Sequence, residues 1–261
     1  MVNKYALILE YDGSIFHGWQ IQNDVKTVQG LLEAALSKFA NEPIATITAG
    51  RTDTGVHALN QVVHFTSSAK RNLDGWVRGV NALLPSEIRI KRAVIVDDNF
   101  DARFSALSRT YHYYLRVAPI NSAHLSRYQG WYYHELNVTK MQQAAQLLIG
   151  RHDFSSFRAA GCQANSPIRE MYNLAIEQKG NLIRFNLTAN AFLHHMVRNI
   201  VGALVYVGVG RITVADFQQI FASANRNNAP PTFMSNGLYL ANVQYPDIIL
   251  GDEGFEQWLF N

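Results

Sequence analysis

The sequence of 261 residues contains a single cysteine, Cys162, and this shortage excludes two kinds of small protein. One thiol cannot build a disulfide framework, and it cannot supply the several cysteine ligands of a structural zinc site. Charged residues make up only 16% of the chain, whereas hydrophobic residues make up 48%, which excludes an intrinsically disordered protein. The sequence therefore predicts a globular protein of one large domain or two small ones.

Long uninterrupted hydrophobic runs are also absent. The most apolar stretch, residues 192–209, is interrupted by His194, His195, Arg198 and Asn199, so it is a poor membrane span. The opening MVNKYALILEYDG has no small-residue cleavage site, and we expect no signal peptide. The sequence predicts a cytoplasmic protein that does not associate with a membrane.

The familiar motifs for cofactors and catalytic metals are missing. The sequence has no GxGxxG, no P-loop, no GxSxG elbow and no HExxH. The adjacent His194 and His195 would project about 100° apart on a helix, which disfavours their binding one ion together. We therefore expect neither a nucleotide cofactor nor a metal.

The net charge of +3 conceals an uneven distribution. Residues 1–107 are neutral, residues 108–246 carry a net charge of +7, and residues 247–261 carry −4. Ten of the twelve basic residues in the middle region are arginines, whose planar group matches phosphate. The pattern indicates either a folded surface that binds a polyanion or an ordinary asymmetric surface.

Hydrophobic periodicity divides the chain into two halves with the same order of elements, β-α-β-β-α-β. In residues 1–105 we expect strands and helices alternating in that order at 5–10, 28–39, 44–49, 61–65, 76–84 and 88–94. In residues 106–261 we expect the same order at 110–117, 141–148, 169–176, 182–188, 192–204 and 237–243, with a short extra helix at 214–221. Thr27, Asn137 and Thr213 are suitable N-cap residues. The pattern predicts an α+β protein of two ferredoxin-like domains whose antiparallel sheets lie side by side with a cleft between them.

The most unusual segment, AGRTDTGVHA at residues 49–58, places Arg51 and Asp53 between two glycines. A loop between strands is where a scaffold commonly presents reactive groups. An arginine two residues before an aspartate can orient the carboxylate and keep it ionised. The alternative is a structural turn closed by an Asx hydrogen bond.

Two further segments contain candidate residues. In the strand that opens the second half, Tyr111 and Tyr113 share one face, which is either an open platform for stacking a nucleobase or a core-facing pair. Arg198 lies in the apolar segment AFLHHMVRNIVGAL, where a charge needs a partner. That partner is either a structural carboxylate or the catalytic one.

Several segments together resemble the TruA family of tRNA pseudouridine synthases, in the right order from Tyr5 to Pro246. They are EYDGSIFHGWQ, TVQGLLEAAL, AGRTDTGVHALNQVVHF, ARFSALSRTYHYYL, GRHDFSSFRAAGC, AFLHHMVRNIVGAL and NAPPTFMSNGLYLANVQYP. Thr54 departs from the family, which usually has alanine there.

The resemblance implies an enzyme that isomerises uridine to pseudouridine at positions 38, 39 and 40 of the tRNA anticodon stem-loop, without cofactor or metal. It implies that Asp53 is the catalytic carboxylate, that Tyr111 binds the substrate, and that Arg51 and Arg198 belong to the catalytic site. It further implies a homodimer on which one tRNA contacts both subunits. The first domain, 1–105, would carry the Asp53 loop, and the second, 106–261, the arginine-rich RNA-binding surface.

Two other function classes remain as alternatives. A non-catalytic RNA-binding protein with paired RRM-like sheets would explain the arginines and Tyr111, but not the segment around Arg51 and Asp53. A metal-dependent hydrolase would use His57, His194 and His195.

Overall fold

The structure is a computed structural model that describes residues 2–246; Met1 and the acidic residues 247–261 lie outside the described part. Residues 2–246 form ten strands and five α-helices, so the protein has a mixed α and β fold, as the sequence predicted. The chain divides into two compact units, each with its own core. Of the described residues, the first unit contains 2–107 and 239–246, and the second contains Ser108–Leu238.

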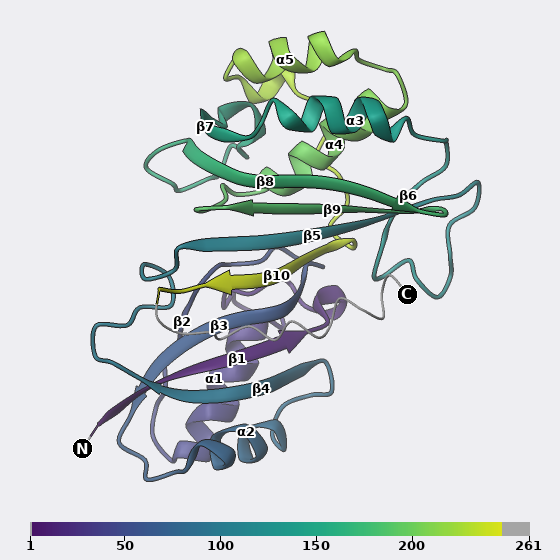
Figure 1. Ribbon diagram of the computed structural model, residues 1–261. Coiled ribbons are helices and arrows are strands. Elements are labelled where there is room, and N and C mark those ends of the chain that lie inside the picture. The colour runs from purple at the N-terminus through teal and green to yellow at the C-terminus, as the bar shows by residue number, and fades with distance from the viewer. Residues whose placement is uncertain (1, 247–261) are drawn as a thin grey trace. The chain divides into compact units, whose positions relative to one another are not determined.

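The first unit is a sheet whose strands lie in the order β4-β1-β3-β10, with a short β2 beside β3 (Figure 1). β1 pairs antiparallel with β3 and β4, and β10 pairs parallel with β3. Its elements are β1 (Asn3–Tyr11), η1 (Gly13–Ile15), α1 (Val28–Ala40), β2 (Ile47–Thr48), β3 (His57–Ser67), α2 (Leu73–Asn81), β4 (Ile88–Val96) and β10 (Leu238–Gln244).

Both helices of the first unit pack against one face of its sheet. The fully buried Trp76 of α2 contacts the rings of Tyr5 on β1 and Phe65 on β3, with centroids 5.2 Å and 5.1 Å away. Thr27 caps α1 as expected, because its side chain accepts a hydrogen bond from the backbone N–H of Gly30.

The opposite face of this sheet is covered by the segment that follows β4. The backbone N–H of Ala102 donates to Nδ1 of His64 on β3 at 3.0 Å, and Tyr245 donates its hydroxyl to the carbonyl oxygen of Ala102 at 2.7 Å. Phe100 packs between the rings of His64 and Tyr245. β3 is therefore buried on both faces along almost its whole length.

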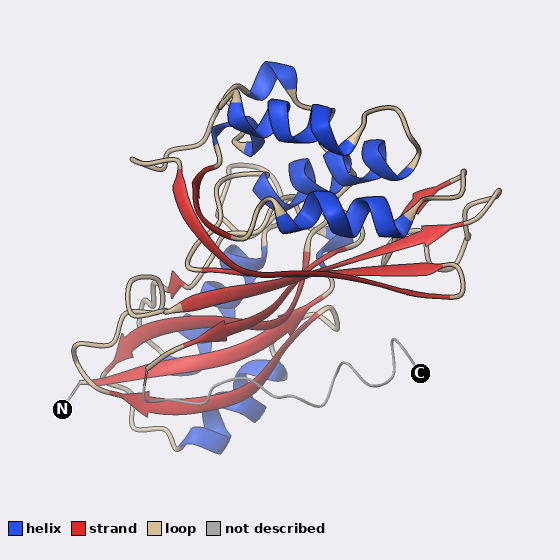
Figure 2. Ribbon diagram, turned by 45° about the horizontal axis from the view of Figure 1, so that its top comes forward, coloured by secondary structure: helices blue, strands red, loops and turns tan. Residues whose placement is uncertain are grey.

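The second unit has strands in the order β5-β9-β8-β7, paired antiparallel, with a short β6 parallel to β5. Its helices α3, α4 and α5 lie on one face of these strands (Figure 2). The elements are β5 (Ser108–Val117), β6 (Gly130–Tyr132), α3 (Val138–Gln146), β7 (Gly150–Asp153), η2 (Ser155–Phe157), β8 (Ile168–Lys179), β9 (Leu182–Ala189), α4 (Met196–Gly208), α5 (Val214–Ala222) and η3 (Arg226–Asn228).

Two caps in the second unit agree with the sequence. The side chain of Asn137 accepts from the backbone N–H of Lys140 at the start of α3. Thr213 and Asp216 form a reciprocal capping box at the start of α5. Short side chains with a hydrogen-bond acceptor therefore mark these helix starts correctly.

The helix expected over residues 192–204 begins later than its apolar spacing suggests. α4 starts at Met196, because His195 takes a left-handed conformation with φ of 60° and ends the preceding loop. Consequently His194 and His195 do not lie on a helix face, and their rings pack together with centroids 4.0 Å apart.

The last strand belongs to a different unit from the one we expected. The predicted domains were 1–105 and 106–261, which would place β10 with the second half. In the structure Tyr239 and Leu240 pair with β3 of the first unit, and Asn60 donates its side-chain amide to the carbonyl oxygen of Ala241 at 2.9 Å. The segment therefore belongs to the first unit although it follows the second in the chain.

Among the helices of residues 2–246, none combines the length and the hydropathy that a membrane crossing requires.

Candidate active site

The loop that carries Asp53 connects β2 to β3 in the first unit. Thr52 is buried, with 7% of its surface exposed, whereas Arg51 is exposed and Asp53 is half-buried. The backbone N–H of Val56 donates to the carbonyl oxygen of Asp53 at 3.1 Å, which closes a turn at Gly55. The loop therefore buries Thr52 and leaves Arg51, and in part Asp53, accessible to solvent.

The segment between β1 and α1 lies directly against this loop. The backbone N–H of Trp19 donates to the carbonyl oxygen of Thr52 at 2.9 Å. Gly18 has a φ of +84°, and a Cβ atom there would lie 2.8 Å from that same oxygen. Because glycine adopts this conformation and leaves this space, the loop can approach the segment closely.

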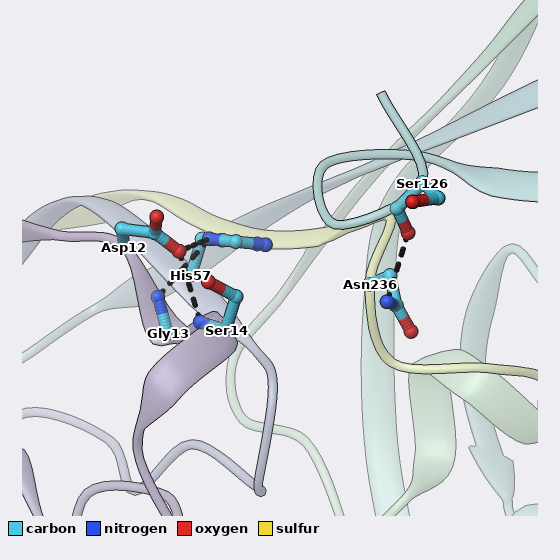
Figure 3. Close-up of polar contacts among 6 residues, drawn as sticks. All are labelled: Asp12, Gly13, Ser14, His57, Ser126 and Asn236. Carbon is cyan, nitrogen blue, oxygen red and sulfur yellow. Dashed lines mark hydrogen bonds and ion pairs between the residues drawn. The ribbon is translucent and has the colours of Figure 1, made fainter. Parts of the chain in front are cut away.

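A buried histidine holds the other end of the loop (Figure 3). His57, 2% exposed, accepts a hydrogen bond at Nδ1 from the backbone N–H of Gly13 at 3.1 Å, and the same nitrogen lies 3.3 Å from Oδ1 of Asp12. That carboxylate oxygen also accepts from the N–H of Ser14. The imidazole stacks on Tyr239, with centroids 4.6 Å apart. His57 therefore ties the end of the loop to the turn formed by Asp12 and Gly13.

Arg51 does not make the contact with Asp53 that we anticipated. Within residues 2–246 its guanidinium group forms no hydrogen bond and no ion pair. An orienting role of Arg51 toward the Asp53 carboxylate therefore stays a prediction. The exposed guanidinium is available to a ligand from outside the chain.

Tyr111 lies on the helix-covered face of β5, in the second unit. Its neighbour on that face, Tyr113, is fully buried against Phe185 of β9 and donates its hydroxyl to the carbonyl oxygen of Met234 at 2.9 Å. Tyr111 is 8% exposed, and its ring meets Phe192 edge to face at 5.0 Å. The pair is thus core-facing rather than on an open sheet, and Tyr111 occupies the margin of that core.

Arg198 lies in the first turn of α4. Its Nε donates to the carbonyl oxygen of Phe233 at 2.9 Å, and the N–H of Phe233 donates to the carbonyl oxygen of Arg198 at 3.2 Å. Burial raises the pKa of Tyr113 well above its usual value, and the charge of Arg198 opposes this shift. The helix dipole disfavours a cation in a first turn, so this position does not favour Arg198 for helix stability.

The segment beside Arg198 is fixed by its own contacts. Asn236 donates its side-chain amide to the carbonyl oxygen of Ser126 at 2.9 Å (Figure 3), and the N–H of Tyr114 donates to the carbonyl oxygen of Gly237. Residues 233–237, which receive the bonds from Arg198 and Tyr113, are therefore held at both ends.

The structure places the predicted site residues in two groups. Arg51 and Asp53 lie on one loop of the first unit, and Tyr111 and Arg198 belong to the second unit. That all four line one cleft stays a prediction.

Sequence reasoning missed the residues that support the Asp53 loop from within, above all Tyr11 and Gln61. An available signal was Gln61, which with Asn60 and His64 is one of three polar residues among the apolar ones of residues 58–65. A buried amide of this kind requires hydrogen-bond partners, although the sequence does not say which.

Comparisons with known proteins give a consistent result. A family model described as tRNA pseudouridine synthase matches residues 7–105 and 144–246. Proteins called tRNA pseudouridine synthase A are similar over nearly the whole chain. The one from Chromobacterium violaceum is 54% identical over 245 residues, covering 94% of each chain. Those from Neisseria meningitidis serogroup C and Paraburkholderia phytofirmans are 53% and 50% identical, covering 94% of this chain and 92% and 91% of theirs.

Proposed function

Because the chain belongs to the tRNA pseudouridine synthase family, we propose that it isomerises uridine to pseudouridine at positions 38, 39 and 40 of the tRNA anticodon stem-loop. The observation that carries this proposal is 54% identity to a tRNA pseudouridine synthase A over 94% of both chains. The intact RTD segment within that span supports assigning the chemistry to Asp53.

The reaction requires little beyond a carboxylate and a closed pocket. The N-glycosidic bond breaks, the uracil turns, a bond forms between the sugar and C5, C5 loses its proton, and N1 gains one. No electrons are gained or lost overall, so the reaction requires no redox cofactor. An ionised Asp53 would either add to the sugar or the base or abstract a sugar proton.

Tyr111, Arg51 and Arg198 receive supporting roles in this proposal. The reacting base must leave its stack before reaction, and an aromatic ring such as Tyr111 can receive it. Arg51, whose guanidinium is exposed, and Arg198, which lies at the positive end of α4, are suited to an anionic substrate. We place all four residues in one cleft between two ferredoxin-like halves. In the first unit β1 lies between β4 and β3, and β2 also pairs with β3, which is compatible with such a half.

The partners follow from the same proposal. The arginine-rich residues 108–246 would bind the tRNA backbone, and position choice would depend more on the shape of the RNA arm than on base readout. We propose a homodimer, as the resemblance implies, and a cytoplasmic location, where tRNA is found.

Replacing Asp53 tests the proposal. Tritium release from tRNA labelled at uracil C5 measures the loss of the C5 proton directly. We expect Asp53→Asn to abolish release while tRNA binding stays within about two-fold. Asp24→Asn makes the same chemical change in an exposed turn, where φ of 61° suits both residues, and should retain full activity.

The alternative function gives a different result in the same assay. A non-catalytic RNA-binding protein would bind an anticodon stem-loop without releasing tritium, even as the unaltered chain. Near-normal turnover of Asp53→Asn would instead exclude Asp53 as the catalytic carboxylate.

A further inference from the structure

A buried hydrogen-bond network lies beneath the Asp53 loop. The hydroxyl oxygen of Tyr11 on β1 lies 2.8 Å from Oγ1 of Thr52. Nε2 of Gln61 on β3 donates to the Tyr11 hydroxyl oxygen at 3.3 Å and to the carbonyl oxygen of Gly50 at 2.7 Å. Three side chains from two strands and the loop thus form one connected unit.

The donors and acceptors of this network leave little freedom in its arrangement. Oε1 of Gln61 accepts from the N–H of Val62 at 3.2 Å, which fixes the amide with Nε2 toward the loop. Both hydrogens of Nε2 are then used, on Gly50 and Tyr11. Since Tyr11 accepts from Gln61, its own hydrogen is available to donate to Thr52. The amide of Gln61 is fully buried, so losing any of these bonds leaves a polar group unsatisfied.

The network acts on the residue between the two candidate catalytic side chains. Thr52 is held by its side chain to Tyr11 and by its carbonyl oxygen to the N–H of Trp19. Thr52 is buried, whereas its neighbours Arg51 and Asp53 are exposed and half-buried. The hydroxyl of Tyr11 therefore contacts the residue that directly precedes Asp53 in the chain.

We propose that Tyr11 and Gln61 are positioning residues, which hold Thr52 and thereby set the direction of the Asp53 carboxylate toward its substrate. This inference rests on the proposed function, in which Asp53 is the catalytic group. It assigns a role to two buried side chains that have no means of reaching the substrate themselves.

The Tyr11 hydroxyl can serve in this way over the whole pH range of an assay. Burial is the main cause that raises its pKa to about 12, and its bonds to Thr52 and Gln61 act in the opposite direction. The group stays protonated, so it remains a donor to Thr52 at any pH at which the enzyme is tested.

The inference is tested by removing single atoms from the network. Tyr11→Phe removes only the hydroxyl, and Thr52→Val replaces the hydroxyl of Thr52 with a methyl group of similar size. We expect each to lower kcat for tritium release by about 10- to 100-fold, because small displacements of a reacting group have effects of this size. KM for tRNA should stay within about two-fold. Thr52→Ser keeps the hydroxyl and should restore kcat to within about three-fold of the unaltered chain.

Tyr245→Phe is the matched control for a loss of stability alone. Tyr245 and Tyr11 are each 4% exposed, both lie in the first unit, and Tyr245 bonds to Ala102 instead of the loop. Both variants should lower Tm by a similar amount, but only Tyr11→Phe should lower kcat at a temperature well below Tm.

The double variant Tyr11→Phe/Thr52→Val tests whether Tyr11 and Thr52 act through the hydrogen bond between them or independently of each other. If both side chains act through their mutual bond, its kcat will equal that of the weaker single variant rather than the product of two losses. Multiplying losses would overturn the inference, as would an unchanged kcat in Tyr11→Phe or Thr52→Val.

Asp53→Asn, assayed in parallel, distinguishes a failure of the positioning role from a failure of the proposed function. If Asp53→Asn is inactive and Tyr11→Phe is fully active, the proposed function stands and the positioning role fails. If Asp53→Asn is active, the catalytic assignment fails, and the positioning role fails with it.

Discussion

A Cβ atom placed on Gly13 would lie 1.9 Å from the carbonyl oxygen of Val56, so residue 13 and the end of the Asp53 loop are in direct backbone contact. We therefore predict that Gly13→Ala displaces Val56 and weakens the adjoining turn at Asp53. Forcing extra volume into a packed site has a typical cost of about 1–3 kcal/mol in the free energy of unfolding. Denaturant unfolding and tritium release should both show losses.

Gly161→Ala is the control for this substitution. No atom lies within 4 Å of a Cβ built at Gly161, and its φ is not in the left-handed region. Its unfolding free energy should change by less than about 0.5 kcal/mol. Equal stability of the two variants would contradict the close contact of Gly13 with Val56.

Protonation of His112 should lower the free energy of unfolding of the protein in mild acid. Burial, and to a smaller extent the charge of Arg184, lowers its pKa from 6.5 to about 4. Between these pH values the unfolded chain binds a proton that the folded chain does not. The stabilisation that depends on a neutral His112 is thus complete above pH 6.5 and is lost as pH falls to about 4. The free energy of unfolding should fall by roughly 3 kcal/mol over this range.

The matching measurement compares denaturant unfolding of the unaltered chain and His112→Gln at pH 7 and pH 5. The variant should be less stable at pH 7, because it disturbs the contact with the Tyr114 hydroxyl, but its stability should depend less on pH. Parallel pH profiles would show that another group titrates in this range.

Glu42 should also lose its stabilising effect as pH falls, but only in stronger acid than His112. Its carboxylate accepts hydrogen bonds from the hydroxyls of Ser67 and Ser68 and from backbone N–H groups, which lower its pKa from 4.5 to about 2. Its stabilising effect is therefore complete above pH 4.5 and is lost as pH falls toward 2. The Tm difference between the unaltered chain and Glu42→Gln should shrink over that range; a constant difference would refute the assignment.

The elements that sequence predicted best are those with a local cause. Thr27, Asn137 and Thr213 cap helices through bonds to residues three positions away, so a short stretch of sequence contains the whole interaction. The start of α4 was missed because Phe192 and Leu193 are apolar for another reason: from a loop, Leu193 packs in the core and the half-buried Phe192 packs against Tyr111. Periodicity does not distinguish a helix from a loop that buries its side chains.

The candidate site shows the same difference between features with a local cause and features that depend on tertiary structure. The position of Asp53 on a loop between strands was predicted from one segment. The support from Tyr11 and Gln61 was not, because it depends on the register in which β1 and β3 pair, with Tyr11 opposite Ala58 and Leu9 opposite Gln61. Register is a tertiary property, and a shift of one strand by one residue would place Tyr11 and Gln61 on opposite faces of the sheet.

Arg198 offers the sharpest test of whether an arginine serves chemistry or RNA binding. Its Nε is bonded to the carbonyl oxygen of Phe233, which fixes the direction of the guanidinium group. We predict that Arg198→Ala lowers kcat more than it weakens tRNA affinity, and that Arg198→Lys does not restore kcat, because lysine lacks the planar donor geometry. Single-turnover tritium release and filter binding measure the two effects separately.

The exposed Arg151 provides the control, for which we expect the reverse result. Arg151→Ala should leave kcat unchanged and weaken tRNA binding. It should also reduce the slope of log Kd against the logarithm of the salt concentration by about one. A larger loss of affinity than of turnover in Arg198→Ala would mean that Arg198 holds a phosphate, and the residue would then belong to the RNA-binding surface.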